Sequence, residues 1–433
     1  MNVTDDLLNF LNSSPVSYLA VETTAKRLEA EGFVRIDASD TMPKLMPGSK
    51  VFFTKNGSSV YAFRIGRRSM ADAGFNVICA HSDSPTFRIK PMPEIIAPGG
   101  VVKLNTEVYG GPILSTWLDR PLSVAGRVVL RSDDPLHPVC RNVVVERPLL
   151  QIPNIAIHMN RAINDGVAYS KQYDMMPVLG MIGSSLEADN MLLRHVAERL
   201  NEDVDDILDF DLYLYDATPA CLFGLNNEFV SSGRIDDLSM VHAGLTALVE
   251  MGDAVPDITQ VLAVFDNEET GSGTKQGAGS PFFASLIQRM VMANGGSADD
   301  YFRAVENAFM VSADNAHAVH PNHPEKYDPK VCPSMGFGPV IKINASQKYA
   351  SDAESSAVFA SICQSAGVPC QRFVNHSDIP GGSTLGNILT SSLPMRGVDM
   401  GNPVWAMHSA REVASVADHE YCIRAFKEFY RLS

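Results

Sequence analysis

Residues 75–83 read Phe-Asn-Val-Ile-Cys-Ala-His-Ser-Asp, an apolar run that ends in His81 and Asp83. A short apolar run of this kind is typical of a strand that is buried on both faces of a sheet. Three later runs end in the same way, and they are 261–265 before Asp266, 309–313 before Asp314 and 404–407 before His408. From residue 231 onward such strands alternate with long helical patterns. We therefore predict an α/β fold in which helices flank a mixed, largely parallel sheet.

The stretch between about Pro91 and Phe229 has a different texture. Prolines and glycines open it, and alternating runs such as 101–109 and 122–131 follow, which is typical of strands joined by turns. We expect one α/β domain in two pieces, residues 1–91 and 229–433, interrupted by a smaller β-rich domain over residues 92–228.

The composition excludes several classes of function. Among 433 residues, 35 Lys and Arg stand against 50 Asp and Glu, which gives a net charge of −15. This charge repels phosphate backbones and anionic lipid, so we expect no nucleic-acid partner and no membrane partner. The chain starts without a basic region, and no apolar window is long enough to span a bilayer, so we expect neither a signal peptide nor a membrane segment. Seven cysteines without a Cys-x-x-Cys pair favour reduced thiols in a cytoplasmic protein.

The polar residues that follow the apolar strands are candidate metal ligands. In open α/β sheets the carboxyl ends of the strands converge on one crevice, so we expect His81, Asp314 and His408 to lie close together. Asp236 is a further candidate from the loop before helix 238–251, although capping of that helix by Asp236 or Asp237 explains the local sequence equally well. Imidazole and carboxylate donors suit Zn²⁺, Mn²⁺ or Co²⁺, and two such ions roughly 3.5–4 Å apart need a bridging carboxylate.

The adjacent residues Glu268 and Glu269 follow strand 261–265 and precede a glycine-rich stretch. One carboxylate of such a pair can bind a metal ion while its neighbour takes the proton from a metal-bound water. The charges agree with this division, because two divalent ions bring four positive charges and Asp236, Glu269 and Asp314 bring three negative ones. The remaining positive charge lowers the pKa of the bridging water.

Taken together, these motifs resemble the aspartyl aminopeptidase family of two-metal exopeptidases. The matching segments are His81-Ser-Asp83-Ser-Pro, Arg234-Ile-Asp236, Asp266-Asn-Glu268-Glu269-Thr-Gly-Ser, Ser312-Ala-Asp314-Asn-Ala-His317, Gly338-Pro-Val-Ile-Lys342 and Ala406-Met-His408-Ser-Ala-Arg411-Glu412. They occur in the family's order and span most of the chain. Two positions depart from the family pattern, since Asp237 stands where Asn is usual and Gly381 stands where many members have Cys.

The resemblance implies a role for each candidate ligand. Asp236 would bridge two divalent ions per subunit, most commonly zinc, with manganese or cobalt as alternatives. His81 and Asp314 would complete one metal site, and Glu269 and His408 the other. In the same pattern, Glu268 would be the general base and Asp83 would orient His81.

The resemblance also implies the architecture and the substrate contacts. The α/β metallopeptidase domain would carry an inserted dimerisation domain, and dimers would assemble into a homododecamer. His158 would reach the active site of a neighbouring subunit, and Lys342 would lie beside the pocket for an acidic side chain. From the residues alone, His158 reads as a core or interface histidine, and only the resemblance gives it another role. Lys342 reads from the residues alone as the solvent-facing residue of an alternating strand. We expect His317 to bind substrate beside the site rather than the metal, because each ion already has three protein ligands.

We therefore expect a cytoplasmic metalloaminopeptidase that acts on peptides with a free N-terminus. It would remove N-terminal residues, preferentially Asp and Glu, by attack of a metal-bridging hydroxide. Two alternatives stay open at this point. One is a dinuclear deacylase or carboxypeptidase that acts on N-acyl amino acids, and the other is a non-catalytic assembly or cargo protein.

Overall fold

The computed structural model describes residues 2–183 and 189–433, and these form two compact units. The first unit contains Met1–Asp83, Cys221–Met407 and Glu412–Ser433, and the second contains Ser84–Ala220 and His408–Arg411. The sequence placed the crossings later, at 91/92 and 228/229. The first crossing differs because strand β5 (Thr86–Ala97) runs through the prolines, and its pairing with β6 (Val101–Tyr109) shifts register between Ile89 and Glu94.

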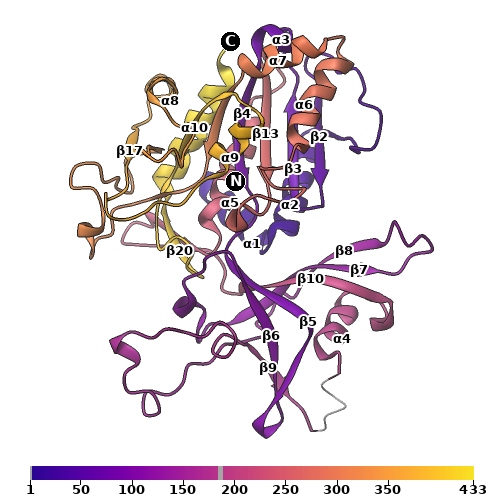
Figure 1. Ribbon diagram of the computed structural model, residues 1–433, viewed down its shortest axis with the longest axis vertical. Coiled ribbons are helices and arrows are strands. Elements are labelled where there is room, and N and C mark those ends of the chain that lie inside the picture. Colours follow the sequence, from indigo (N-terminus) through magenta and orange to yellow (C-terminus); the bar gives the residue numbers. More distant parts are fainter. Residues whose placement is uncertain (1, 184–188) are drawn as a thin grey trace. The chain divides into compact units, whose positions relative to one another are not determined.

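A nine-stranded mixed sheet forms the centre of the first unit (Figure 1). Its strand order is β1-β2-β3-β13-β4-β14-β18-β16-β17. In sequence order the strands are β1 (Val34–Arg35), β2 (Lys50–Lys55), β3 (Ser59–Arg64), β4 (Phe75–His81), β13 (Thr259–Phe265), β14 (Phe309–Ala313), β16 (Val340–Lys342), β17 (Gln371–Phe373) and β18 (Arg396–Gly401). The central strands β13, β4, β14 and β18 run parallel to one another. Every residue of β4 is buried, as expected for a strand covered on both faces.

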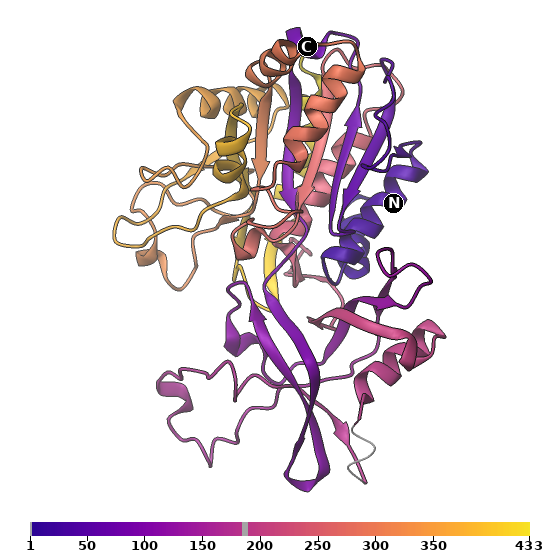
Figure 2. The same ribbon diagram turned by 45° about the vertical axis from the view of Figure 1, so that its right-hand side comes forward.

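Helices cover both faces of this sheet (Figures 1 and 2). One group packs around α5 and consists of α1 (Val3–Ser13), α2 (Ser17–Ala30), α5 (Ile235–Val249), α8 (Ala353–Ser365) and α10 (Val416–Arg431). The other group contributes to a single apolar core with the sheet and consists of α6 (Phe282–Ala293), α7 (Ala298–Glu306) and α9 (Leu385–Ser392), with the short α3 (Met70–Ala73) beside α7. The predicted α/β fold is confirmed.

Helix α5 lies close to the central strands, and this closeness fixes the start of the helix near the end of β4. All of its residues from Ile235 to Leu248 are buried. A side chain at Gly244 would lie 2.8 Å from Leu262 of β13 and 3.2 Å from Ile78 of β4, so glycine permits the close approach. The first turn of α5, with Asp236, is thereby held beside the strand that carries His81.

A second, five-stranded sheet in the first unit has the order β11-β12-β20-β19-β15. Its strands are β11 (Cys221–Phe223), β12 (Phe229–Ser232), β15 (Ala316–His317), β19 (Pro403–Trp405) and β20 (Glu412–Ser415). Strand β12 leads directly into α5, and β20 pairs with β12 through Ser232 and Glu412. This pairing places the Glu412 side chain next to the first turn of α5.

The second unit is built on an antiparallel sheet of six strands with the order β8-β7-β10-β5-β6-β9. The strands not yet given are β7 (Leu122–Leu130), β8 (Val139–Val144), β9 (Val178–Met181) and β10 (Ile207–Asp216), and helix α4 (Met191–Leu200) accompanies them. The unit has its own apolar core, which includes Phe87, Trp117 and Leu212. Among the described residues of the chain, no helix combines the length and the apolar character that a membrane crossing requires.

Candidate metal centre

His81 is the last residue of β4, and its imidazole is buried. Its Nδ1 lies 3.0 Å from the backbone oxygen of Asp83 and 3.4 Å from the carboxylate of the same residue. Because a backbone oxygen only accepts hydrogen bonds, Nδ1 carries the proton, and in the neutral ring Nε2 carries the lone pair that a metal ion needs. Nε2 lies 3.6 Å from Oδ1 of Asp236. Asp83 therefore orients His81 through its backbone as well as its side chain.

Asp236 and Asp237 stand at the start of α5, where the backbone is not yet helical. The Asp236 N–H donates to Oε2 of Glu412 at 3.0 Å. Asp237 accepts a hydrogen bond from the His81 N–H at 3.1 Å and one from the Asn315 side chain at 3.3 Å. Because the regular helical backbone begins after Asp237, both aspartates lie at the N-terminal end of the helix, and a capping contribution by Asp237 is compatible with a ligand role for Asp236.

Asp314 follows β14 directly, and four side chains meet at this point. One ligand atom from each of His81, Asp236, Asp237 and Asp314 lies within 4.8 Å of the others, and all four residues are buried. We call these four residues the ligand cluster. One imidazole and three carboxylates are donors that divalent ions such as Zn²⁺ and Mn²⁺ accept, so the residues present fit a metal site.

The Glu268–Glu269 pair lies in a short 3-10 helix after β13, and Asp83 holds it in place. The Asp83 carboxylate accepts hydrogen bonds from the Glu268 N–H at 3.1 Å and from the Glu269 N–H at 3.2 Å. Side-chain atoms of His81, Glu268 and Glu269 also lie within 4.8 Å of one another. The structure thus brings the two glutamates to the ligand cluster, as the sequence predicted.

Burial and negative neighbours dominate the electrostatics of the cluster. Burial raises the pKa of Glu268 to about 8; His81 opposes this shift, and Asp314 is the first of the carboxylates that add to it. Burial is also the first cause that raises the pKa of Asp237 and of Asp314. The pKa of His81 lies well above its usual value, since the carboxylates, led by Asp237, outweigh the opposing effect of burial. Such a cluster favours added positive charge, which divalent ions supply.

His408 belongs to the second unit, so its place beside Glu269 stays a prediction. Within that unit its Nδ1 lies 3.1 Å from the backbone oxygen of Gly111. The Nδ1–H therefore donates to this oxygen, and Nε2 is the nitrogen that can bind a metal ion. This is the same hydrogen-bonding arrangement that His81 has with the Asp83 backbone.

The predicted substrate-binding residues lie in different surroundings. Lys342 is 4% exposed, and its Nζ lies 3.3 Å from Oδ1 of Asp314, so it is not the solvent-facing residue of an alternating strand. His317, on β15, is exposed, and its ring packs edge-on against Phe373 with the centroids 5.8 Å apart. His158 lies in an exposed turn of the second unit. The structure brings Lys342 to the ligand cluster, while the roles of His317 and His158 stay predictions.

Two residues that support the cluster were not assigned a role from the sequence. Asn315 donates from its side chain to the backbone oxygen of Ile235 at 2.9 Å and to Asp237 at 3.3 Å, and Glu412 accepts from Asp236. Their positions in the sequence could have indicated these roles, because Asn315 follows Asp314 and Glu412 ends the motif that begins before His408.

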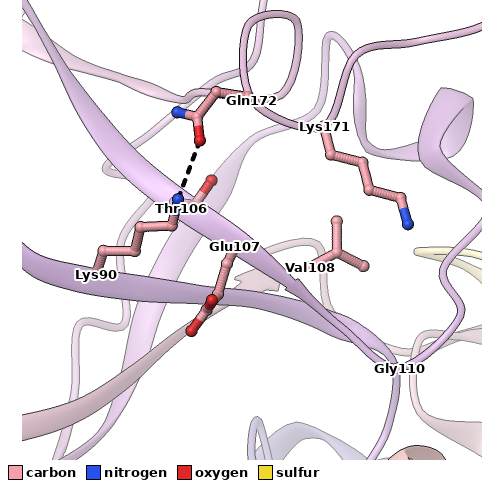
Figure 3. A pocket seen from close by; sticks show the side chains of 7 residues that line it. All are labelled: Lys90, Thr106, Glu107, Val108, Gly110, Lys171 and Gln172. Atoms are coloured by element: carbon pink, nitrogen blue, oxygen red, sulfur yellow. Dashed lines mark hydrogen bonds between the residues drawn. The ribbon is translucent and has the colours of Figure 1, made fainter.

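Two cavities lie away from these residues. In the second unit, a cavity of about 250 Å³ is bounded by the β5–β6 hairpin and by the loop with Lys171 and Gln172 (Figure 3). Lys90 reaches Gln172 there at 3.1 Å, and Glu107 also lines the space. In the first unit, a cavity of about 310 Å³ is lined by Arg67, Arg68 and Asp300, among others. Neither cavity is lined by a predicted site residue.

Comparison with known proteins identifies similar chains. The family model described as aminopeptidase I zinc metalloprotease (M18) matches residues 10–430. A probable M18 family aminopeptidase 2 of Clostridium acetobutylicum is 48% identical over 426 residues, which is 98% of each chain. One of Pseudomonas aeruginosa is 40% identical over 431 residues, covering 99% of this chain and 97% of the relative.

Two solved structures are similar to this chain in fold. A chain of the cryo-EM structure of the Ape4 and Nbr1 complex has a TM-score of 0.95 and 35% identity, covering 99% of this chain and 85% of that one. The mApe1 of Chaetomium thermophilum has a TM-score of 0.88 and 29% identity, covering 99% of this chain and 96% of that one.

Proposed function

Because the chain belongs to the M18 family of aminopeptidase I zinc metalloproteases and is a metal-dependent aminopeptidase, we propose that it prefers peptides that begin with Asp or Glu. The observation that carries this proposal is the ligand cluster with a buried lysine beside it. Lys342 places a positive charge 3.3 Å from Asp314. In the proposed function, the N-terminal residue of a substrate would be bound beside this lysine. A buried cation is a suitable partner for the carboxylate of an acidic side chain.

The proposed metal ligands follow from the donor set. His81 and Asp314 would hold one ion, Glu269 and His408 the other, and Asp236 would bridge them. Zinc is the first candidate, with manganese or cobalt as alternatives. When bound, the ions would polarise the scissile carbonyl and acidify the attacking water.

Glu268 is the general base of the proposed mechanism. Its carboxylate lies beside the ligand cluster, and the hydrogen bond from its N–H to Asp83 holds the backbone that carries it. In the reaction, Glu268 takes the proton from the attacking water and passes it to the nitrogen of the leaving peptide. Asp83 fixes His81 and the two glutamates at once, so it sets the distance between the base and the ligands.

We also propose a cytoplasmic homododecamer built from dimers. The turn around His158 exposes three large apolar side chains, with exposed fractions of 59% at Ile155, 53% at Ile157 and 82% at Met159. An exposed apolar group of this kind favours burial against another subunit, where His158 would take part in that subunit's site. The cytoplasmic location is supported by the seven cysteines, which are all free thiols. Native mass spectrometry would give the subunit number.

The test of the proposed activity is a substrate panel with metal control. The protein is stripped with a chelator and reconstituted with zinc, manganese or cobalt. Hydrolysis is then measured on peptides that begin with Asp, Glu, Leu or Lys, together with N-acetylated versions of the same peptides. We expect Asp and Glu peptides to be cleaved fastest, blocked peptides to be untouched and the stripped protein to be inactive. Equal rates on Asp and Leu peptides would contradict the acidic preference, and cleavage of blocked peptides would favour a deacylase.

A further inference from the structure

We propose that Asp399 is a positioning residue that shapes the substrate side-chain pocket around Lys342, an inference that rests on the proposed preference for acidic residues. Asp399 lies on β18 opposite Ser312 of β14, one strand away from Lys342 on β16. It is completely buried. Burying a carboxylate is costly unless hydrogen bonds compensate it, so the contacts of Asp399 show what this charge holds in place.

The Asp399 carboxylate binds three separate segments of the chain. Its Oδ1 accepts hydrogen bonds from the Ser312 hydroxyl at 2.6 Å and from the Thr384 hydroxyl at 2.7 Å. Its Oδ2 accepts a hydrogen bond from the Ala350 N–H at 2.5 Å. The carboxylate therefore joins the strand that leads to Asp314, the turn before α8 and the start of α9.

The local sequence is adapted to this carboxylate. A side chain at Gly386 would lie 2.6 Å from both oxygens of Asp399, so the space for the carboxylate exists only because residue 386 is glycine. The Asp399 N–H also donates to the Ser351 hydroxyl at 2.8 Å, which adds a second connection to the turn that contains Ala350.

This turn connects Asp399 to Lys342. Tyr349 precedes Ala350, and its ring centroid lies 5.7 Å from the Lys342 Nζ. Tyr349 is itself buried, so its position depends on the backbone that Asp399 holds. Moving the turn would move the tyrosine that packs on the lysine. The charges of Asp399 and Lys342 also interact directly through space, so Thr384→Val, which keeps the Asp399 charge, isolates the proposed effect through the Tyr349–Ala350 backbone.

The test is Asp399→Asn in the full-length, metal-loaded enzyme. An amide has one acceptor oxygen and a donor group, so it cannot accept from both hydroxyls and from the Ala350 N–H. We expect KM for Asp- and Glu-initiated peptides to rise about tenfold, because a misplaced binding group weakens recognition. We expect kcat to change less than KM, Leu-initiated peptides to be affected about twofold or less, and metal content to stay unchanged.

Asp418→Asn is the matched control. Asp418 is also completely buried, and it accepts hydrogen bonds from the N–H groups of Gly336 at 2.6 Å and Gly338 at 2.7 Å. The control loses the same charge in a comparable setting, so it should lower the melting temperature without changing the ratio of Asp to Leu cleavage. Thr384→Val removes one hydrogen bond and keeps the Asp399 charge, and it should shift KM in the same direction by a smaller factor.

The outcomes separate the two proposals. If the wild type prefers acidic residues but Asp399→Asn and Thr384→Val leave the Asp-to-Leu ratio unchanged, the positioning role is overturned and the proposed function stands. An equal fall on Asp and Leu peptides, as for a generally damaged site, overturns the role as well. If Asp399→Asn does not fold, Thr384→Val alone decides by the same ratio. A wild type without acidic preference overturns the proposed preference and this inference together.

Discussion

Helix α5 contributes to two polar clusters that differ in how their charges are balanced. At its N-terminal end, the ligand cluster combines one imidazole with three carboxylates. Further along the helix, His242 contacts His419 at 2.9 Å and Asp6 at 2.9 Å, and Asp6 is also bound by Arg27 at 2.8 Å. We call the residues Asp6, Arg27, His242 and His419 the histidine cluster.

The pKa values of aspartates differ between the two clusters, since those of Asp237 and Asp314 are raised in the ligand cluster and that of Asp6 is lowered in the histidine cluster. In the ligand cluster, burial raises the pKa of the Asp237 and Asp314 carboxylates. In the histidine cluster, the pKa of Asp6 lies well below its usual value, because the hydrogen bond with His242 outweighs burial and Arg27 adds to the effect. The histidine cluster is therefore balanced within the protein and ties α1 and α2 to α5 and α10. The ligand cluster is balanced only in part, because His81 and Lys342 face three carboxylates and the adjacent Glu268 and Glu269. This difference distinguishes a site built to bind cations from a structural contact.

The largest expected effect is the loss of catalytic rate on replacing Glu268, which lies beside the ligand cluster. Glu268→Gln should lower kcat by at least about 100-fold, because the amide cannot accept the proton of the attacking water. Metal content should stay at the wild-type level, since Glu268 is not among the proposed ligands. Steady-state kinetics on an Asp-initiated peptide and elemental analysis check the two statements. Glu306→Gln, an exposed position at the end of α7, is the control. Near-normal turnover of Glu268→Gln would remove its role as base.

In the metal-free protein, the free energy of unfolding should fall as pH rises, because of the raised pKa of Glu268 beside the ligand cluster. The pKa of Glu268 is raised from 4.5 to about 8, with burial as the first cause. Between these values the folded metal-free protein holds a proton that the unfolded chain has released, so stability falls as pH rises. We expect the melting temperature of the stripped protein to drop by roughly 2–4 °C between pH 5 and pH 8, and zinc to abolish most of this drop. A stripped protein that becomes more stable over this range would contradict the unbalanced cluster.

The strand pattern was sufficient to predict much of this site from the sequence. His81 and Asp314 follow buried strands, and parallel pairing of those strands places their ends together. The helix-capping alternative for Asp236 and Asp237 could not be decided locally. The Asp236 N–H donates to Glu412 of β20 and the Asp237 carboxylate accepts from the His81 N–H of β4, and both strands are distant in sequence. The burial of Lys342 was missed for the same reason. Alternation within one strand does not show which segments cover it.

The first domain boundary was predicted at 91/92, whereas the compact units divide between Asp83 and Ser84, and the difference arises because prolines usually end strands. Here Pro91 and Pro93 lie inside β5 at an irregularity of its pairing, and the strand continues on the other side. The prolines and glycines therefore predicted the existence of a β-rich insertion more accurately than they predicted the residue at which it starts.

The histidine cluster should show the opposite pH dependence with a smaller amplitude. Burial lowers the pKa of His242 and, more strongly, of His419, and the usual value is 6.5. Below 6.5 the unfolded chain takes up protons that the folded cluster does not bind, so stability falls as pH falls. His419→Gln should cost about 1 kcal/mol at pH 7.5 through the lost contact with His242, and should lose less stability than the wild type between pH 7 and pH 5. Chemical unfolding at both pH values measures this. A changed kcat would show that the cluster is not merely structural.

The smallest expected effect on catalysis is that of Asp237→Asn, which places the family's usual residue in the ligand cluster. The Asn side-chain oxygen can still accept the hydrogen bond from the His81 N–H. The variant therefore removes the negative charge of Asp237 and keeps its contact with the end of β4. We expect kcat to change about threefold or less, because Asp237 is not among the proposed ligands. The metal-free protein should gain about 1 kcal/mol at pH 8, since one buried carboxylate is removed from among like charges. Asn315→Ala, which removes the other hydrogen bond of Asp237 and keeps its charge, is the control and should give no such gain. Equal stabilisation of the metal-free protein by both variants, or stabilisation by neither, would contradict like-charge repulsion in the ligand cluster, the property by which it differs from the histidine cluster.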